Sequence, residues 1–89
     1  MVISIDSLPD YLEIIGIDTD DVSVGDYADD RWCVMQRQDG KWTVFYRERG
    51  GNFDESVFDN EADACYAMLG RMTLLQITRG RFHFDDDVE

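Results

Sequence analysis

The fold is decided by residues 31–58, which read RWCVMQRQDGKWTVFYRERGGNFDESVF. Two runs rich in β-branched and aromatic residues are separated there by Asp39-Gly40, a pair that supplies the positive φ angles of a two-residue type I′ turn. A second break at Gly50-Gly51 allows the chain to return as a third strand. The stretch therefore predicts a three-stranded antiparallel meander, with strands at 31–38, 41–48 and 52–58.

Two-residue turns also predict which residues share a sheet face, because side chains alternate along a strand. Pairing Gln38 with Lys41, and continuing the alternation through the second turn, assigns one face to the core. This predicted core face comprises Cys33, Met35, Trp42, Val44, Tyr46, Phe53 and Val57. The opposite face mixes polar and apolar side chains, and its apolar members include Trp32, Val34 and Phe45. If exposed, these three would form a patch for self-association.

A helix is predicted on each side of the meander. Before it, Ser7 is typical of an N-cap and Gly16 of a helix end. After it, Asn60 is placed to cap a longer helix that ends at Arg79, just before Gly80. The pattern predicts a short N-terminal helix and a long C-terminal one.

The longer helix carries an apolar stripe at helical spacing, which can pack on the sheet. The stripe comprises Ala62, Cys65, Met68, Leu69, Met72 and Leu75. Gln76 shares the spacing but is polar, so we leave it out of the buried set. Gly70, in mid-helix, costs about 1 kcal/mol relative to Ala and indicates close packing against another backbone or a local bend.

These elements predict one α+β domain over residues 1–89: an N-terminal helix, a three-stranded antiparallel meander and a long C-terminal helix packed on the sheet. Residues 81–89 are expected to be a frayed acidic tail. At 89 residues there is room for a single modest core. We expect no second domain.

Charge is the most informative property of the composition. The chain has 20 acidic residues against 8 Lys and Arg, a net charge of −12, and residues 1–30 hold nine acids and no base. Such a field repels nucleic acid and anionic membranes, and attracts cationic proteins. No apolar run approaches the roughly 20 residues of a membrane span, and the N-terminus does not resemble a signal peptide. We expect a cytoplasmic protein with a basic protein partner, bound to neither nucleic acid nor membrane.

Motifs for catalysis, cofactors or metals are not found. The one histidine, His83, lies in the predicted tail, and no nucleophile motif or phosphate-binding glycine loop is present. Asp18 and Asp20 could begin a calcium loop, but Val22 and Ser23 stand where a ligand and a glycine are needed. We therefore expect no enzyme, no cofactor and no metal site.

Clusters of acids around Tyr27 and Phe58 predict an interface instead. Carboxylates bind Lys and Arg of a partner, and an exposed aromatic ring supplies an apolar anchor. The alternative is a solvated charged face with both aromatics in the core. The predicted partner-binding residues are Asp18, Asp20, Asp21, Asp26, Tyr27, Asp29, Asp30, Asp54, Glu55, Asp59 and Glu61.

The stretch at 42–69, WTVFYRERGGNFDESVFDNEADACYAML, resembles small immunity proteins of bacterial polymorphic toxin and contact-dependent growth inhibition systems. In many of these an aromatic-rich strand ending in an E-R-G type turn precedes an F-x-x-E-x-x-A-C helix start. The resemblance implies a cytosolic antidote that binds the C-terminal toxin domain of a secreted effector, often a basic nuclease. The alternative hypothesis is a small self-associating adaptor or regulatory protein, and a homodimer is compatible with both.

Overall fold

The computed structural model describes residues 2–80, so the predicted tail at 81–89, with His83, lies outside the described residues. The elements are α1 (Leu8–Ile14), η1 (a 3₁₀ turn, Thr19–Asp21), β1 (Val22–Val24), β2 (Arg31–Gln36), β3 (Trp42–Glu48), β4 (Gly51–Phe58) and α2 (Glu61–Thr78). The α+β class, the N-terminal helix and the long C-terminal helix are confirmed.

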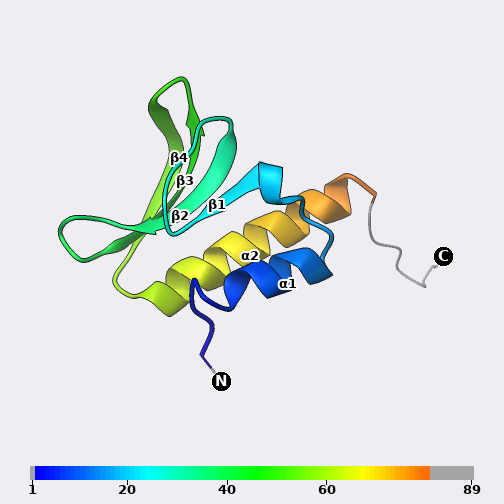
Figure 1. Ribbon diagram of the computed structural model, residues 1–89, viewed down its shortest axis with the longest axis horizontal. Coiled ribbons are helices and arrows are strands. Elements are labelled where there is room, and N and C mark those ends of the chain that lie inside the picture. Colours follow the sequence, from blue (N-terminus) through cyan, green and yellow to red (C-terminus); the bar gives the residue numbers. More distant parts are fainter. Residues whose placement is uncertain (1, 81–89) are drawn as a thin grey trace.

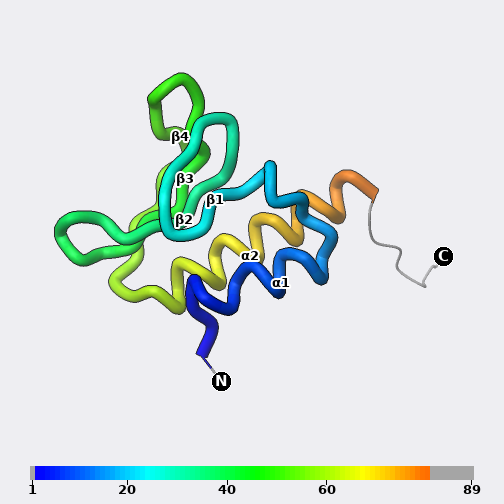
Figure 2. The backbone as a smooth tube through the Cα atoms, viewed as in Figure 1, coloured from blue at the N-terminus to red at the C-terminus, as the bar shows by residue number. Residues whose placement is uncertain are grey.

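The sheet has four strands in the order β1-β2-β3-β4, with both helices packed on one of its faces (Figure 1). The backbone trace in Figure 2 shows α1 running beside α2. β2, β3 and β4 form the predicted antiparallel meander, but β1 adds a parallel pair with β2. The three-stranded prediction is thus incomplete. With only three residues, β1 is too short to show a strand period among the acids that surround it.

The first hairpin turn differs from the prediction. The amide of Arg37 donates to the oxygen of Lys41 at 2.7 Å, so residues 38–40 form a three-residue loop, with Gly40 at φ 89°. The turn with two positive φ angles lies instead at Arg49 (52°) and Gly50 (79°). The extra loop residue shifts the β2–β3 register by one position.

A one-residue shift moves every side chain of β2 to the opposite face. Val34 pairs with Val44 and faces the helices, whereas Cys33 pairs with Phe45 on the outer face. The predicted core face is therefore wrong for β2 and right for Trp42 and Val44 of β3.

An irregularity in β4 produces a further difference. The β3–β4 register shifts between Val44 and Tyr46, and Asp54 takes a positive φ of 53° opposite this point. Beyond the shift, Val57 pairs with Thr43 and stays 44% exposed, while Phe58 packs against the core. The prediction that Val57 belongs to the core is wrong, because a bulge resets the alternation.

The core lies between the sheet and the two helices. Asn60 caps α2 as predicted, since its side chain accepts a hydrogen bond from the amide of Asp63 at 2.9 Å. Two interpretations of α2 are wrong. Gln76 is buried, with 1% exposure, and Gly70 does not pack closely against another backbone, because the space where its Cβ would stand is open. The buried apolar residues of this core are Ile3, Leu8, Leu12, Ile17, Val22, Val34, Val44, Ala64, Cys65, Met68 and Met72.

The outer face of the sheet is partly covered by residues 25–30. The thiol of Cys33 approaches the oxygen of Ala28 at 3.5 Å, and the amide of Asp30 donates to the oxygen of Arg47 at 2.6 Å. Beneath this loop Phe45 is 2% exposed. Both faces of the central strands are therefore buried, although the helices lie on only one of them.

Candidate functional site

A groove of about 520 Å³ opens between α1 and the β1 edge of the sheet. Leu12 and Ile17 are buried side chains on its helix side, and Val22 and Val24 line it from β1. It forms because Gly16 ends α1 at φ 82° and turns the chain back toward the sheet, leaving a hollow beside a strand only three residues long. The floor of the groove is apolar.

Acidic side chains form the rim of this groove. Asp10 and Glu13 are exposed on one side of α1, three residues apart, and Asp18 is exposed at the start of η1. Among residues 2–80 no basic residue lines the groove, and none of the four ion pairs found in this range involves these three acids. We call Asp10, Glu13 and Asp18, with the apolar floor they surround, the acidic groove.

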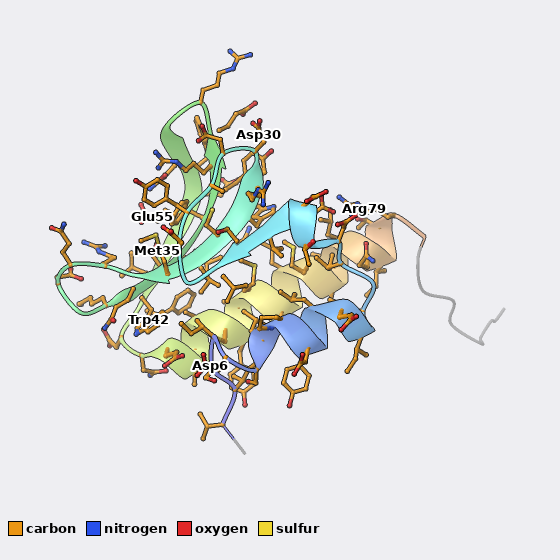
Figure 3. All side chains as sticks on the ribbon, in the orientation of Figure 1. Asp6, Asp30, Met35, Trp42, Glu55 and Arg79 are labelled. Carbon is orange, nitrogen blue, oxygen red and sulfur yellow. The ribbon has the colours of Figure 1, made fainter. Side chains whose placement is uncertain are left out.

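A second hollow, of about 640 Å³, lies on the outer face of the sheet. Arg37 and Arg47 line it together with Asp39 and Glu55, so its charges balance. Figure 3 shows Glu55 and Met35 close together on this side. A balanced lining has no net preference for a charged ligand, whereas the lining of the acidic groove carries only negative charge.

The predicted interface acids of η1 lie near the acidic groove. Asp18 is part of its rim, and one of its oxygens accepts from the amide of Asp20 at 3.1 Å. Asp21 is partly buried and lies 3.5 Å from Arg79, the residue that follows α2. Asp18 and Asp20 are thus exposed toward solvent, while Asp21 helps to hold η1 against the end of α2.

The predicted residues of the 25–30 loop mainly stabilise the protein's own fold. Arg47 lies 3.2 Å from Asp29 and stacks over the ring of Tyr27, 4.3 Å from its centroid. Asp29 also accepts from the amide of Gly50 at 3.3 Å. Asp26 and Asp30 are exposed. Tyr27 remains 53% exposed, so it can still contact a partner.

The remaining predicted acids lie around β4 and the start of α2, away from the acidic groove. Glu55 accepts from the hydroxyl of Thr43 at 2.7 Å, and Asp59 lies 3.4 Å from Lys41. Glu61 accepts from the amide of Ile5 at 2.8 Å and so anchors the N-terminal segment. Asp54 is exposed at the bulge. The predicted set is therefore divided among several surfaces.

The acidic residues are spread widely, since Asp6 lies on the helix side of the molecule and Asp30 at the far end of the sheet (Figure 3).

The three residues predicted to form a self-association patch do not share an exposed surface. Val34 is fully buried and Phe45 is 2% exposed, on opposite faces of the sheet. Trp32 is partly buried under Arg71, whose guanidinium lies 4.5 Å from the ring centroid.

Sequence reasoning missed Asp10 and Glu13. The i, i+3 spacing of the two acids was nevertheless a usable signal, because side chains three residues apart lie on the same side of a helix. The apolar floor could not be found in this way, because it joins α1 to β1, a strand that the pattern does not predict. Only the tertiary structure brings Leu12 and Val24 to the same groove.

Within residues 2–80, no group of three or more His, Cys, Asp or Glu side chains could hold a metal ion, and no helix has the length and apolar character needed to cross a membrane. Both cysteines are buried and unpaired. Burial raises the pKa of Cys33, and it raises the pKa of Cys65 to about 11, so both thiols are protonated at neutral pH.

Comparison of the chain with models of known protein families, with curated proteins and with solved structures finds no match.

Proposed function

We propose that this chain is a cytoplasmic immunity protein that neutralises the basic toxin domain of a secreted effector by binding it through the acidic groove. The observation that carries the proposal is the groove itself, which in the described part of the chain has three exposed carboxylates, no basic residue and an apolar floor. Carboxylates attract the partner's Lys and Arg, while the apolar floor supplies the desolvated contact on which affinity depends. The net charge of −12 favours the same class of partner.

The proposed interface is smaller than the acid set inferred from the sequence. Acids paired with the protein's own Arg or Lys, such as Asp29 and Asp59, are largely neutralised by those partners. The unpaired acids carry the net charge that speeds encounter with a basic partner, and among them Asp10, Glu13 and Asp18 contact it.

The direct test pairs the chain with the C-terminal domain of a secreted effector encoded beside it and scores rescue of bacterial growth. Binding of the same two proteins is measured at low and physiological salt, and we expect the affinity to fall by about tenfold or more as salt screens the charges. A triple variant, Asp10→Asn, Glu13→Gln and Asp18→Asn, is expected to lose rescue.

The control is a triple variant with the same change in charge, made at the exposed acids Asp39, Glu48 and Asp63, all outside the acidic groove. It is expected to retain rescue. Equal loss of affinity in both variants would assign binding to net charge rather than to this groove. Rescue that persists in the groove variant, with affinity independent of salt, would contradict the proposal.

The self-associating adaptor finds no comparable support in the arrangement of Trp32, Val34 and Phe45. Two of the three side chains are buried within one molecule, so neither is available to a second copy. Sedimentation at increasing concentration tests this alternative independently of any toxin.

A further inference from the structure

The outer edge of β1 is free to accept another strand. Within residues 2–80, β1 stands at the end of the sheet order and pairs only with β2, with Ser23 opposite Cys33. The amide of Gly25 donates to the oxygen of Val34 at 2.8 Å. In a parallel ladder alternate residues bond to the same neighbour, so Ser23 and Gly25 face β2 while Val22 and Val24 turn their amide and carbonyl groups outward.

The two edges of the sheet differ in their protection against pairing. The β4 edge has a register shift, a positive φ at Asp54 and the exposed charges of Asp54 and Glu55, which are features that block strand addition. β1 consists of Val22, Ser23 and Val24, and has neither charge nor irregular backbone. Of the two edges, β1 is therefore the receptive one.

The acidic groove lies directly beside this edge. Val22 and Val24 line the groove together with Leu12 of α1, so a strand added to β1 would pass over the apolar floor. Alternate side chains of that strand would point toward the groove. An apolar side chain can occupy the floor, and the side chains two positions before and after it can reach the rim acids if they are Lys or Arg.

We propose that β1 and the acidic groove together bind an extended segment of a cationic protein, which joins the sheet as a fifth strand and carries a basic-x-apolar-x-basic pattern on its inner face. This inference rests on the proposed function for the charge of the partner and adds the mode of binding. The main-chain hydrogen bonds hold the segment, and the groove selects its side chains. Three rim carboxylates without a basic neighbour in the groove provide the charge complementarity.

The probe is a capped seven-residue peptide, Thr-Lys-Thr-Val-Thr-Lys-Thr, titrated into the full chain labelled with nitrogen-15. A short edge strand predicts weak binding, with a dissociation constant on the order of 0.1–1 mM. We expect the amide signals of Val22 and Val24 to shift and hydrogen exchange at Val24 to slow. A peptide with glutamate in place of lysine is expected to bind about tenfold more weakly or not at all.

The backbone contribution is tested with Val24→Pro, which removes an outward amide without touching the ladder to β2. We expect its affinity for the peptide to fall about tenfold, while Val24→Thr, which keeps the amide and the side-chain shape, stays within about threefold. If Val24→Pro does not fold, the wild-type protein is titrated with a peptide N-methylated at alternate residues, which removes the donors from the ligand instead.

Strand addition would be overturned if neither Val24→Pro nor N-methylation of the peptide lowered the affinity, or if the signal shifts were confined to residues outside β1 and α1. That failure is separable from failure of the proposed function. If the Val24→Pro variant still rescues growth, the antidote function is supported and the toxin is bound in another way. If the peptide binds but no toxin domain is neutralised, strand addition is supported and the cationic partner is a different protein.

Discussion

The side-chain amide of Gln76 donates a hydrogen bond to the main-chain oxygen of Ile15, 2.9 Å away, and so ties α2 to the end of α1 across 61 residues of sequence. Gln76 is 1% exposed, so no bulk water replaces this bond when it is lost. It holds the C-terminal end of α1 beside the acidic groove.

Gln76→Leu is expected to lower the free energy of unfolding by about 1–3 kcal/mol, because it fills a similar space but leaves the partly buried Ile15 oxygen without its donor. Urea denaturation measures the change. Leu74→Ala is the control on the same helix, since Leu74 is 60% exposed, and it should change stability by about 0.5 kcal/mol or less. A Gln76→Leu protein as stable as the parent would show that the bond is dispensable.

Two glycines predict opposite effects of the same substitution. Gly16 has a φ of 82°, and a Cβ there would stand 3.0 Å from Nε2 of Gln76, so Gly16→Ala should destabilise the fold by about 1–2 kcal/mol. Gly70 lies inside α2 with open space around it, so Gly70→Ala should stabilise by about 0.5–1 kcal/mol. Thermal melting of both variants tests the pair. The prediction is wrong if the two shifts have the same sign.

Arg47 joins three parts of the outer face, because its guanidinium contacts Asp29, the ring of Tyr27 and, at 3.0 Å, the side-chain oxygen of Asn52. Lysine cannot reproduce this planar set of contacts, so Arg47→Lys is expected to cost about 1 kcal/mol and to speed hydrogen exchange at Asp30.

The matched control for Arg47→Lys is Arg37→Lys. Arg37 forms an ion pair with Asp39 in which both side chains are exposed, so the pair should contribute less than about 0.5 kcal/mol to stability. Equal exchange at Asp30 in the two variants would contradict a role for Arg47 in holding the 25–30 loop.

The buried thiol of Cys65 predicts a loss of stability at alkaline pH. Burial raises its pKa from 9.0 to about 11, so the folded state holds the proton more tightly than the unfolded state does. The resulting stabilisation is complete below pH 9 and is lost as the pH rises to about 11. Urea midpoints across this range should fall more steeply for the parent than for Cys65→Ala, in which the other alkaline titrations remain. Parallel curves would contradict the prediction.

Local chemistry explains which elements were predictable. Asn60 caps α2 and Gly16 ends α1 because a side-chain acceptor and a positive φ act within a few residues of sequence. The sequence also predicts a turn at Asp39-Gly40, but with two loop residues instead of the three that the structure has. One additional loop residue costs little free energy locally, yet it moves Val34 into the core and Cys33 out of it.

The candidate site was predictable in part. Asp18, one of the predicted residues, lies at the rim of the acidic groove, but Asp29 and Glu61 make contacts within the protein with partners 18 and 56 residues away. The interface assignment from charge clusters could not distinguish acids that meet their own arginines from acids that face solvent. Whether an acid is paired depends on residues that come close to it only in the folded chain.

By itself, then, the sequence determined the class of the fold, its two helices, its meander and its negative charge, because propensity, capping and composition act over short distances or over the chain as a whole. Only the tertiary structure decided the register, the existence of β1 and the acidic groove between Leu12 and Val24. A three-residue parallel strand has no periodic pattern of its own, and it is stable because β2 supplies its hydrogen bonds and Val22 is part of the hydrophobic core.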